Sequence, residues 1–509
     1  MKPILTPQQA VQWVQDGMTL CTGGFGGLCH PEALTSALEQ RFLSTGAPRD
    51  LTLFFAAGQG DRKNRGLNHL AHEGLLKRVM GGHWGYAPKL QTLVLENKAE
   101  GYNFPQGVMA HMIRDCAGGR PGTLTHVGLG TFVDPRLQGG KINARTTEEL
   151  VRLMELDGKE YLLYPSIPLD IAFVRATTAD SQGNASLERE AAVLETLSIM
   201  QAAKNSGGRV ILQVERLVEP GAVPPRACRF PGHLVDAIVV AAPEEHEMLL
   251  GHAYNPGITG ESRVPVDSLP PMELNERKVI ARRCFMEARP GDVTNLGIGI
   301  PEGVAAVAAE RGEESLILSL ESGPVGGIPQ GGLAFGACLN FDSLLDTPSQ
   351  FDFYDGGGLD LAVLGLAELD RCGNVNVSRF GPRLPGCGGF INISQNARKM
   401  VFCGTFTAGG LETSVADGKL TIVTEGRIKK FRREVEQITF SAEYAVKDGR
   451  KALYVTERAV FELCGQGLRL IEIAPGIDLE RDVLGQMEFT PLIAEDLKPM
   501  ASWIFHEAR

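Results

Sequence analysis

The sequence lacks any apolar run that approaches the ~18 residues needed to span a bilayer. Its opening residues, Met1-Lys-Pro-Ile-Leu-Thr-Pro-Gln-Gln9, contain no apolar core of a signal peptide. The ten cysteines are scattered, and none forms a Cys-x-x-Cys pair. In a chain of 509 residues this favours free thiols in a reducing compartment over disulfides or a zinc site. We therefore expect a cytoplasmic protein with no bound metal and no membrane contact.

An excess of positive charge is also missing. The formal net charge is −11, whereas nucleic-acid binders usually carry a basic balance or a basic stripe. The one dense basic stretch, Arg427-Ile-Lys-Lys-Phe-Arg-Arg433, is interpreted as a solvated face. A nucleic-acid partner is therefore not expected.

Several common catalytic and nucleotide-binding motifs are absent as well. The segment Gly23-Gly-Phe-Gly-Gly27 is not Gly-x-Gly-x-x-Gly and lacks the Lys-Ser/Thr of a phosphate loop. The later segment Gly297-Ile-Gly-Ile-Pro-Glu-Gly303 has one residue too many for a dinucleotide fingerprint. No Gly-x-Ser-x-Gly elbow of a serine hydrolase occurs. These gaps argue against a dinucleotide or phosphate-loop site and against a serine hydrolase.

The residue content of the chain is typical of an α/β protein. Hydrophobic residues make up 43% and charged residues 22%, as in ordinary globular domains. Many of the 61 glycines stand in loops between apolar runs, where strands turn into helices. The length favours two large domains or three ordinary ones.

Two segments of the chain resemble each other. Residues 15–32 and residues 289–302 each read as a turn, a short strand, a glycine loop and a helix that opens with Pro-Glu. A helix precedes each copy. The first starts at Thr6, with Thr6-Pro-Gln-Gln9 as a capping box, and the second covers roughly 273–288.

A second pair of segments repeats more closely. Residues 170–187 and residues 360–377 share Asp-x-Ala, an apolar pair, and Asp-x-x-Gly-Asn before another strand. Because Asp-x-x-Gly-Asn is turn chemistry, each copy predicts a β-hairpin.

The order of these repeats is the same in both halves, and the first half is longer between them. We therefore predict two related open α/β domains with mostly parallel sheets, at 1–265 and 272–509, the first carrying an insertion. The join is placed in the proline-rich stretch 263–271. Ligands bind beyond the carboxyl ends of parallel strands, and the active site is expected between the two halves.

Glu321 is the most informative single residue. It directly follows the apolar run Ser315-Leu-Ile-Leu-Ser-Leu320 and precedes a loop with five glycines, at 323, 326, 327, 331 and 332. This pattern predicts a carboxylate fixed at the end of a buried strand, where another backbone or a ligand can come close. Desolvation there would make it a better nucleophile. The alternative is a capping or ion-paired acid at a strand end.

A carboxylate that attacks an acyl group needs fixed hydrogen-bond donors for the oxyanion that forms. The glycine turn Gly386-Cys-Gly-Gly389 offers backbone N–H groups, and Asn103-Phe-Pro-Gln-Gly107 offers the Gln106 amide. The alternatives are a plain tight turn and a surface glutamine.

Taken together, these residues resemble the family I coenzyme A-transferases, in the fused arrangement that joins both subunit-type domains. The likeness covers essentially the full chain and is closest to the propionate or acetate CoA-transferases. Its marks are Gly23-Gly-Phe25, His30-Pro31, Pro105-Gln-Gly107, 128–135, 295–301, Glu321-Ser-Gly323, 351–360 and 374–380.

The resemblance implies that Glu321 is the nucleophile, with Gln106 and the Gly388 and Gly389 backbone as the oxyanion hole. One position departs from the family, which usually has glycine where this chain has Cys29. This puts the backbone geometry near the site entrance in doubt. Substrate contacts are predicted, from their nearness in sequence to the glycine turn, for Gly386, Arg379, Arg383, Arg398 and Lys399.

The implied reaction is a ping-pong transfer of coenzyme A from a short-chain acyl-CoA to a free carboxylate such as acetate, propionate or acetoacetate. Coenzyme A would be a co-substrate, bound covalently to Glu321 in mid-cycle, with no metal and no other cofactor. The family suggests a homodimer or homotetramer. Two alternatives are an acyl-CoA hydrolase that uses the same glutamate and, in another class, a ligand-sensing regulator.

Overall fold

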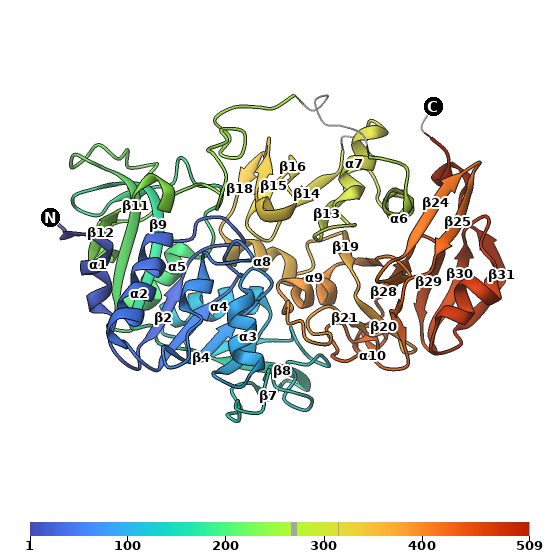
Figure 1. The fold of residues 1–509 in the computed structure, drawn as a ribbon, viewed down its shortest axis with the longest axis horizontal. Coiled ribbons are helices and arrows are strands. Elements are labelled where there is room, and N and C mark those ends of the chain that lie inside the picture. Colours follow the sequence, from blue (N-terminus) through green and yellow to red (C-terminus); the bar gives the residue numbers. More distant parts are fainter. Residues whose placement is uncertain (266–271, 314, 508–509) are drawn as a thin grey trace. The chain divides into compact units, whose positions relative to one another are not determined.

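The computed structural model describes residues 1–265, 272–313 and 315–507, and these form two compact units (Figure 1). Unit 1 comprises 1–264, 321–352 and 382–392, and unit 2 comprises 265–320, 353–381 and 393–509. Unit 1 therefore draws two stretches from the second half of the chain. The chain first leaves unit 1 after Val264, which lies within the predicted join at 263–271. Residues 266–271 of that join lie outside the described residues.

Unit 1 contains a nine-stranded sheet with eight strands in the order β1-β12-β11-β9-β2-β3-β4-β5, while β10 pairs with β9. The strands along this path pair in parallel throughout, and only β10 runs antiparallel to its neighbour. Their bounds are β1 Ile4–Leu5, β2 Thr19–Thr22, β3 Leu51–Phe55, β4 Leu76–Gly81, β5 Glu100–Asn103, β9 Ile171–Asp180, β10 Ala185–Ser186, β11 Arg209–Val218 and β12 Ala237–Val240.

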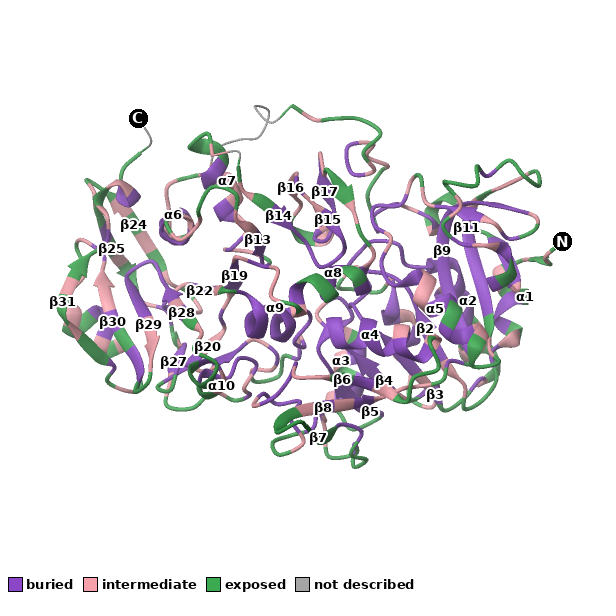
Figure 2. Ribbon diagram, turned by 180° about the vertical axis from the view of Figure 1, so that it is seen from behind, coloured by how far each residue is buried: buried purple, intermediate pink, exposed green. Residues whose placement is uncertain are grey.

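The helices of unit 1 explain the burial of this sheet. Their bounds are α1 Pro7–Ala10, α2 Glu32–Thr45, α3 Pro88–Leu95, α4 Gln106–Ala117 and α5 Thr196–Asn205. Every residue of β9 is buried, as expected for a central parallel strand covered on both faces (Figure 2). Leu20, Leu53, Val79, Phe173 and Ile211 contribute to one apolar core.

Smaller sheets complete unit 1. The order β6-β8-β7 forms a separate antiparallel sheet, and two short antiparallel pairs, β15 with β18 and β16 with β17, follow Glu321. The bounds are β6 Gly122–Thr125, β7 Arg152–Leu156, β8 Lys159–Pro165, β15 Pro324–Val325, β16 Ile328–Pro329, β17 Cys338–Leu339 and β18 Ser343–Leu344. Helices α8 Thr347–Asp355 and α9 Phe390–Asn396 each begin in unit 1 and end in unit 2.

The main sheet of unit 2 has the order β14-β13-β19-β22-β28-β29-β30-β31, of which the first five strands are parallel. Smaller groups are β21-β20-β27, β23-β26 and β24-β25. The bounds are β13 Val293–Leu296, β14 Ile317–Ser319, β19 Leu361–Gly365, β20 Glu368–Asp370, β21 Val375–Asn376, β22 Lys399–Cys403, β23 Thr407–Ala408, β24 Glu412–Ala416, β25 Lys419–Thr424, β26 Ile428–Lys429, β27 Phe431–Arg432, β28 Lys451–Val455, β29 Ala459–Cys464, β30 Gly467–Ile473 and β31 Leu492–Pro499. Its helices are α6 Glu276–Phe285, α7 Gly303–Glu310 and α10 Ala442–Lys447.

The first repeated aspartate makes the same contacts in each unit. Asp170 Oδ2 accepts a hydrogen bond from Thr19 N at 2.8 Å, and Asp360 Oδ2 accepts one from Val293 N at 3.0 Å. The backbone N–H of each aspartate donates back to the carbonyl of the same partner, at 3.0 Å in both units. Each aspartate thus ties the start of one parallel strand to the start of its neighbour.

The predicted hairpins are also confirmed, as β9–β10 and β20–β21. In each turn the aspartate Oδ1 accepts from the backbone N–H of the asparagine at 3.0 Å, and Oδ2 accepts from its side-chain amide at 3.0 Å. The pairs are Asp180 with Asn184 and Asp370 with Asn374. The sequence repeat is therefore a repeat of hydrogen-bond geometry.

Most other sequence-based expectations hold, and one fails. The predicted α/β class with mostly parallel sheets is confirmed, as are the Thr6–Gln9 capping box and ten free cysteines. The helix expected at 273–288 spans Glu276–Phe285. The basic stretch near 430 is not a uniformly solvated face, because Lys430 and Phe431 are buried beside apolar strands. Among the helices of the described residues, none combines the length and apolar character that crossing a bilayer requires.

Candidate active site

Glu321 lies two residues beyond the end of β14, and it is only 7% exposed. The glycines that follow let the backbone fold tightly against itself. A β-carbon on Gly323, whose φ is +116°, would lie 2.0 Å from the carbonyl oxygen of Leu345. The next side chain is also fixed, since Ser322 Oγ donates to the Gly336 carbonyl at 2.6 Å. The predicted buried carboxylate at a strand end is therefore present.

Gln106 is the first residue of α4 and directly follows the Phe104-Pro105 connection from β5. The residue is 3% exposed, and its Nε2 atom has no hydrogen-bond partner within the described part of the chain. An unpaired buried donor costs about 1–3 kcal/mol, so its retention needs a reason. The alternative of a surface glutamine is thereby excluded.

The glycine turn is clamped to the carboxyl ends of β4 and β5. Gly388 N donates to the Gly82 carbonyl at 2.8 Å, and Gln106 N donates to the Gly388 carbonyl at 2.8 Å. Asn103 completes the clamp by accepting from Cys387 N at 3.0 Å and donating to the Gly82 carbonyl at 2.7 Å. The turn is therefore a rigid part of the sheet edge that carries Gln106.

Gly389 brings this turn against Glu321. A β-carbon on Gly389 would lie 3.1 Å from Glu321 Cγ and 3.3 Å from Glu321 Oε1. The Gly388 N–H is already engaged with Gly82, whereas the Gly389 N–H has no partner among the residues that the structure describes. Gln106 flanks the same turn, because a β-carbon on Gly388 would lie 3.9 Å from Gln106 Oε1. Unit 1 thus brings together residues from both halves of the chain.

A further polar residue at this turn escaped the sequence analysis. His83 follows Gly81-Gly82 at the end of β4, and a β-carbon on Gly388 would lie 3.5 Å from His83 Cδ2. The pattern is the one that marked Glu321, a polar residue placed where a buried strand runs into glycines. The same signal, Gly81-Gly-His-Trp-Gly85, could have identified it.

The first glycine loop, Gly23–Gly27, is held by a buried polar network. His30 Nδ1 lies 2.7 Å from Gln59 Oε1, and His30 Nε2 lies 2.8 Å from Thr35 Oγ1. Burial lowers the pKa of His30 to about 4, so the ring is neutral near pH 7. His30 therefore anchors the start of α2 rather than titrating in the site.

Cys29 adopts the backbone conformation that explains the glycine usual at its position. Its φ is +55°, in the left-handed region that glycine enters at little cost. The side chain is buried beside Phe25, Ala192 and Phe335, and burial raises the pKa of its thiol. The loop thus keeps the glycine geometry with a cysteine in place, and the doubt about this segment is resolved.

The predicted substrate-binding residues occupy different places. Gly386 lies in the clamped turn, where a β-carbon would come within 2.6 Å of Trp84. Arg383 is exposed a few residues before it. Within unit 2, Arg398 pairs with Asp360 at 2.8 Å, Lys399 pairs with Glu287, and Arg379 lies 3.6 Å from Glu436. Arg398 and Lys399 stand at the amino end of β22. Their role in substrate binding stays a prediction.

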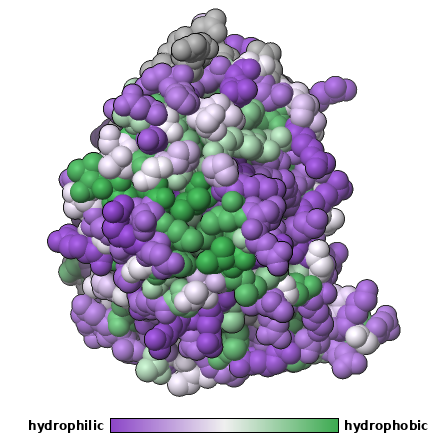
Figure 3. Space-filling model, turned by 90° about the vertical axis from the view of Figure 1, so that its right-hand side faces the viewer, coloured by the Kyte–Doolittle hydropathy of each residue, from purple (hydrophilic) through white to green (hydrophobic). Residues whose placement is uncertain are grey.

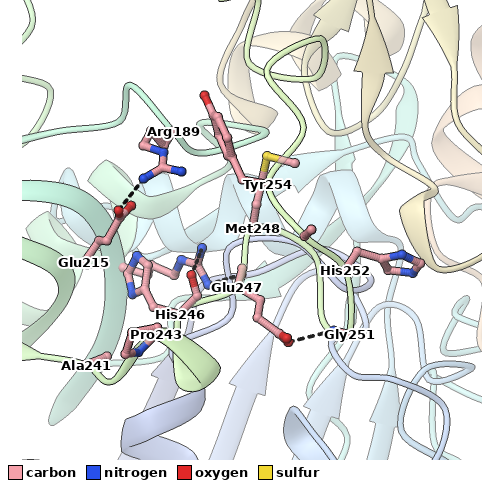
Figure 4. A pocket seen from close by; sticks show the side chains of 12 residues that line it. Arg189, Glu215, Ala241, Pro243, His246, Glu247, Met248, Gly251, His252 and Tyr254 are labelled. Carbon is pink, nitrogen blue, oxygen red and sulfur yellow. Dashed lines mark hydrogen bonds and ion pairs between the residues drawn. The ribbon is translucent and has the colours of Figure 1, made fainter.

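A separate cavity of about 520 Å³ lies elsewhere in unit 1 (Figure 4). Its wall includes Arg175, Arg189, His246 and Tyr254, and none of the twelve residues that line it belongs to the predicted site. Arg189 pairs with Glu215 at the cavity wall, and its guanidinium carbon lies 3.9 Å from the centroid of the Tyr254 ring. The cavity is thus distinct from the Glu321 turn.

Comparison with known proteins identifies the family. Residues 4–241 match the family described as Coenzyme A transferase. The chain is 47% identical to acetate CoA-transferase YdiF of Escherichia coli K12 over 99% of its length and 96% of the relative. It is 46% identical to caffeate CoA-transferase of Acetobacterium woodii over 100% of its length and 98% of the relative.

Solved structures agree with this assignment. The structure of acyl-CoA transferase YdiF apoenzyme from Escherichia coli O157:H7 matches with a TM-score of 0.95 and 46% identity, covering 100% of this chain and 96% of that one. A YdiF thioester complex with CoA matches with a TM-score of 0.94 at the same identity and coverage. The chain belongs to the coenzyme A transferase family.

Proposed function

We propose that this protein transfers coenzyme A from a short-chain acyl-CoA to a free short-chain carboxylate, such as acetate, propionate or acetoacetate. The observation that carries the proposal is the buried Glu321 carboxylate against the Gly389 backbone, beside the unpaired Gln106 amide. Two fixed donors next to a desolvated carboxylate suit acyl transfer through a covalent intermediate.

The chemistry runs in balanced steps. A Glu321 carboxylate oxygen attacks the thioester carbonyl, and the C–S bond breaks to release CoA thiolate and a glutamyl–acyl anhydride. The thiolate then attacks the glutamyl carbonyl, which releases the free acid and leaves a glutamyl-CoA thioester. An acceptor carboxylate reverses both steps. The leaving groups are thiolate and carboxylate, so the exchange needs no proton transfer.

The oxyanion in these steps would be bound by Gln106 Nε2 and the Gly389 N–H. Both donors lack partners within the described residues, whereas the Gly388 N–H already donates to Gly82. We therefore assign Gly388 to holding the turn in place. A preorganised donor of this kind is worth about 3–4 kcal/mol in the transition state.

The relatives support the same reaction class. Two of them are an acetate CoA-transferase and a caffeate CoA-transferase, and a related solved structure is a thioester complex with CoA. The proposal includes no metal and no cofactor, with coenzyme A as a co-substrate bound covalently in mid-cycle. Gly386, Arg379, Arg383, Arg398 and Lys399 stay candidates for contacts to the coenzyme.

The proposal extends to location and assembly. Ten free thiols favour a reducing compartment, so we place the protein in the cytoplasm. We also propose a homodimer or homotetramer. Figure 3 shows apolar side chains gathered on one face, and exposed apolar residues of unit 2 include Val423, Leu492 and Ile493. Patches of this kind often mark interaction surfaces.

The test is direct detection of the intermediate. Incubation with an acyl-CoA should add the mass of CoA less one water to the peptide that contains Glu321. Borohydride should then reduce this thioester to a primary alcohol and release CoA, which leaves a permanent mark on the Glu321 side chain. Glu321→Gln should abolish both the adduct and the transfer, while the exposed Glu434→Gln should retain them. Transfer at a normal rate by Glu321→Gln would reject the proposal. Release of acid and CoA without an acceptor would instead show a hydrolase.

A further inference from the structure

His83 is fixed beside the turn that carries the proposed oxyanion donors. The residue before it, Gly82, accepts the Gly388 N–H at 2.8 Å, and a β-carbon on Gly82 would lie 3.0 Å from Gln106 Cα. The His83 ring itself faces Gly388, whose added β-carbon would lie 3.5 Å from Cδ2. His83 and Gln106 therefore flank the same backbone.

Two glycines make room for this imidazole. A β-carbon on Gly58 would lie 2.7 Å from His83 Nδ1, and one on Gly85 would lie 2.8 Å from Cε1 and 3.2 Å from Nε2. Neither glycine has a left-handed φ. At Gly85 the imidazole alone limits the space, whereas a β-carbon on Gly58 would also lie 2.5 Å from the His83 carbonyl oxygen. Both the ring and the backbone of His83 are therefore closely packed against glycines.

The ring contacts another aromatic side chain. The His83 and Tyr86 ring centroids lie 5.3 Å apart. Neither ring nitrogen has a hydrogen-bond partner among the residues that the structure describes, although the side chain is only partly exposed. A histidine held by packing, with both nitrogens unused, is available to a ligand.

The ring is also kept neutral. Burial, with a smaller contribution from the Arg62 guanidinium, lowers the pKa of His83 to about 4. Near pH 7 it is therefore one N–H donor and one acceptor. A cationic imidazole at this turn would attract the nucleophilic carboxylate and compete with the acyl group. A neutral ring can donate a hydrogen bond without that penalty.

We propose that His83 contacts the substrate carboxylate, with its N–H bonded to the carboxylate oxygen that does not attack. In the second half-reaction the other oxygen attacks the glutamyl carbonyl, the C–S bond breaks, and the thiolate leaves with the electron pair. No proton moves, and the ring is unchanged at the end of the cycle. The same contact holds the departing acid in the first half-reaction. This inference deepens the proposed function and rests on it.

The test separates binding of the acid from binding of coenzyme A. His83→Phe keeps a ring of similar size and removes the donor, and His83→Asn restores a donor. The exposed His233→Phe serves as the control. The Glu321–CoA thioester of each full-length variant is mixed with rising concentrations of acetate, and thiolate release is followed. The dissociation constant of free CoA is measured in parallel.

His83→Phe should raise the half-saturating acetate concentration about tenfold or more, the expected loss of a hydrogen bond to a charged group. His83→Asn should recover part of that loss, and the affinity for free CoA should stay unchanged. An unchanged acetate dependence in His83→Phe overturns the inference alone. An equal loss of CoA affinity also overturns it, because it shows a structural role. Absence of the thioester in the wild-type protein overturns the proposed function and, with it, this inference.

Discussion

Gly389 and Glu321 are so close that a β-carbon on the glycine would lie 3.1 Å from Cγ of the glutamate. Gly389 does not have a left-handed φ, so the backbone alone would tolerate alanine. The constraint is space, since the same β-carbon would also lie 3.2 Å from the Phe351 ring. This relationship gives the first prediction.

Gly389→Ala should lower kcat about tenfold, because the added methyl group displaces its neighbours, Glu321 among them, by a few tenths of an ångström. The fold should survive, because a small movement of the Glu321 side chain can make room for a single methyl group. Steady-state kinetics and the thermal midpoint measure the two effects. Gly465→Ala is the matched control, because its β-carbon meets no atom within 4 Å. Full activity of Gly389→Ala would remove the turn from the active site.

Gln106→Met should separate activity from stability. Removing one of the two proposed oxyanion donors should lower kcat about 10²–10³-fold. Because Gln106 Nε2 is buried without a partner in the described chain, an apolar side chain of similar volume should leave the free energy of unfolding unchanged or raise it by about 1 kcal/mol. Kinetics and urea unfolding test both parts, with the exposed Gln12→Met as control. A variant that loses stability while keeping its activity would show that the amide is structural.

Glu195 should make stability depend on pH. Burial, with a smaller effect of Asp346, raises the pKa of this carboxyl from 4.5 to about 7. Between these values the unfolded chain loses its proton while the folded chain keeps it, so stability falls as pH rises from about 4.5 to 7. Glu195→Gln removes this penalty, which amounts to at most about 3 kcal/mol.

Urea unfolding of Glu195→Gln and wild type at pH 5 and pH 8 checks this expectation. The variant should gain stability over wild type at pH 8 and much less at pH 5. The exposed Glu244→Gln should show no such difference. A gain of equal size at both pH values would mean that the carboxyl is not protonated in the folded state.

Cys29 offers a test of backbone geometry. Cys29→Gly relieves the left-handed φ of +55° but loses a buried thiol, and these effects offset each other within about 1 kcal/mol. Cys29→Val places a β-branched residue in that conformation and should cost about 2–3 kcal/mol. The urea midpoints of the two variants measure these changes in stability. Equal stability of the glycine and valine variants would show that φ does not constrain this position.

The repeated turns could be predicted from the sequence because each is formed by hydrogen bonds within a few residues. A turn such as Asp180-Ser-Gln-Gly-Asn184 is closed by its own side chains, and its copy near Asp370 is closed by the same bonds. The buried strands were readable for a similar reason, because a run such as Ile171–Val174 must be covered on both faces.

The solvated face predicted around Lys430 failed because a charge run does not reveal which of its members packs inward. Lys430 is buried and donates to the Thr405 carbonyl at 2.9 Å. That contact joins residues that only the fold brings together. A contact between residues far apart in the sequence cannot be predicted from a local sequence pattern.

The sequence by itself determined the α/β class, the repeated hairpins and the carboxylate at a strand end, because strand periodicity, turn chemistry and glycine loops act over a few residues. Only the tertiary structure decided that Gly388 is engaged while Gly389 faces Glu321, and that His83 stands at the same turn. These relationships depend on hydrogen bonds and packing between segments hundreds of residues apart. Such contacts form only when the whole chain is folded, so no local segment of the sequence predicts them.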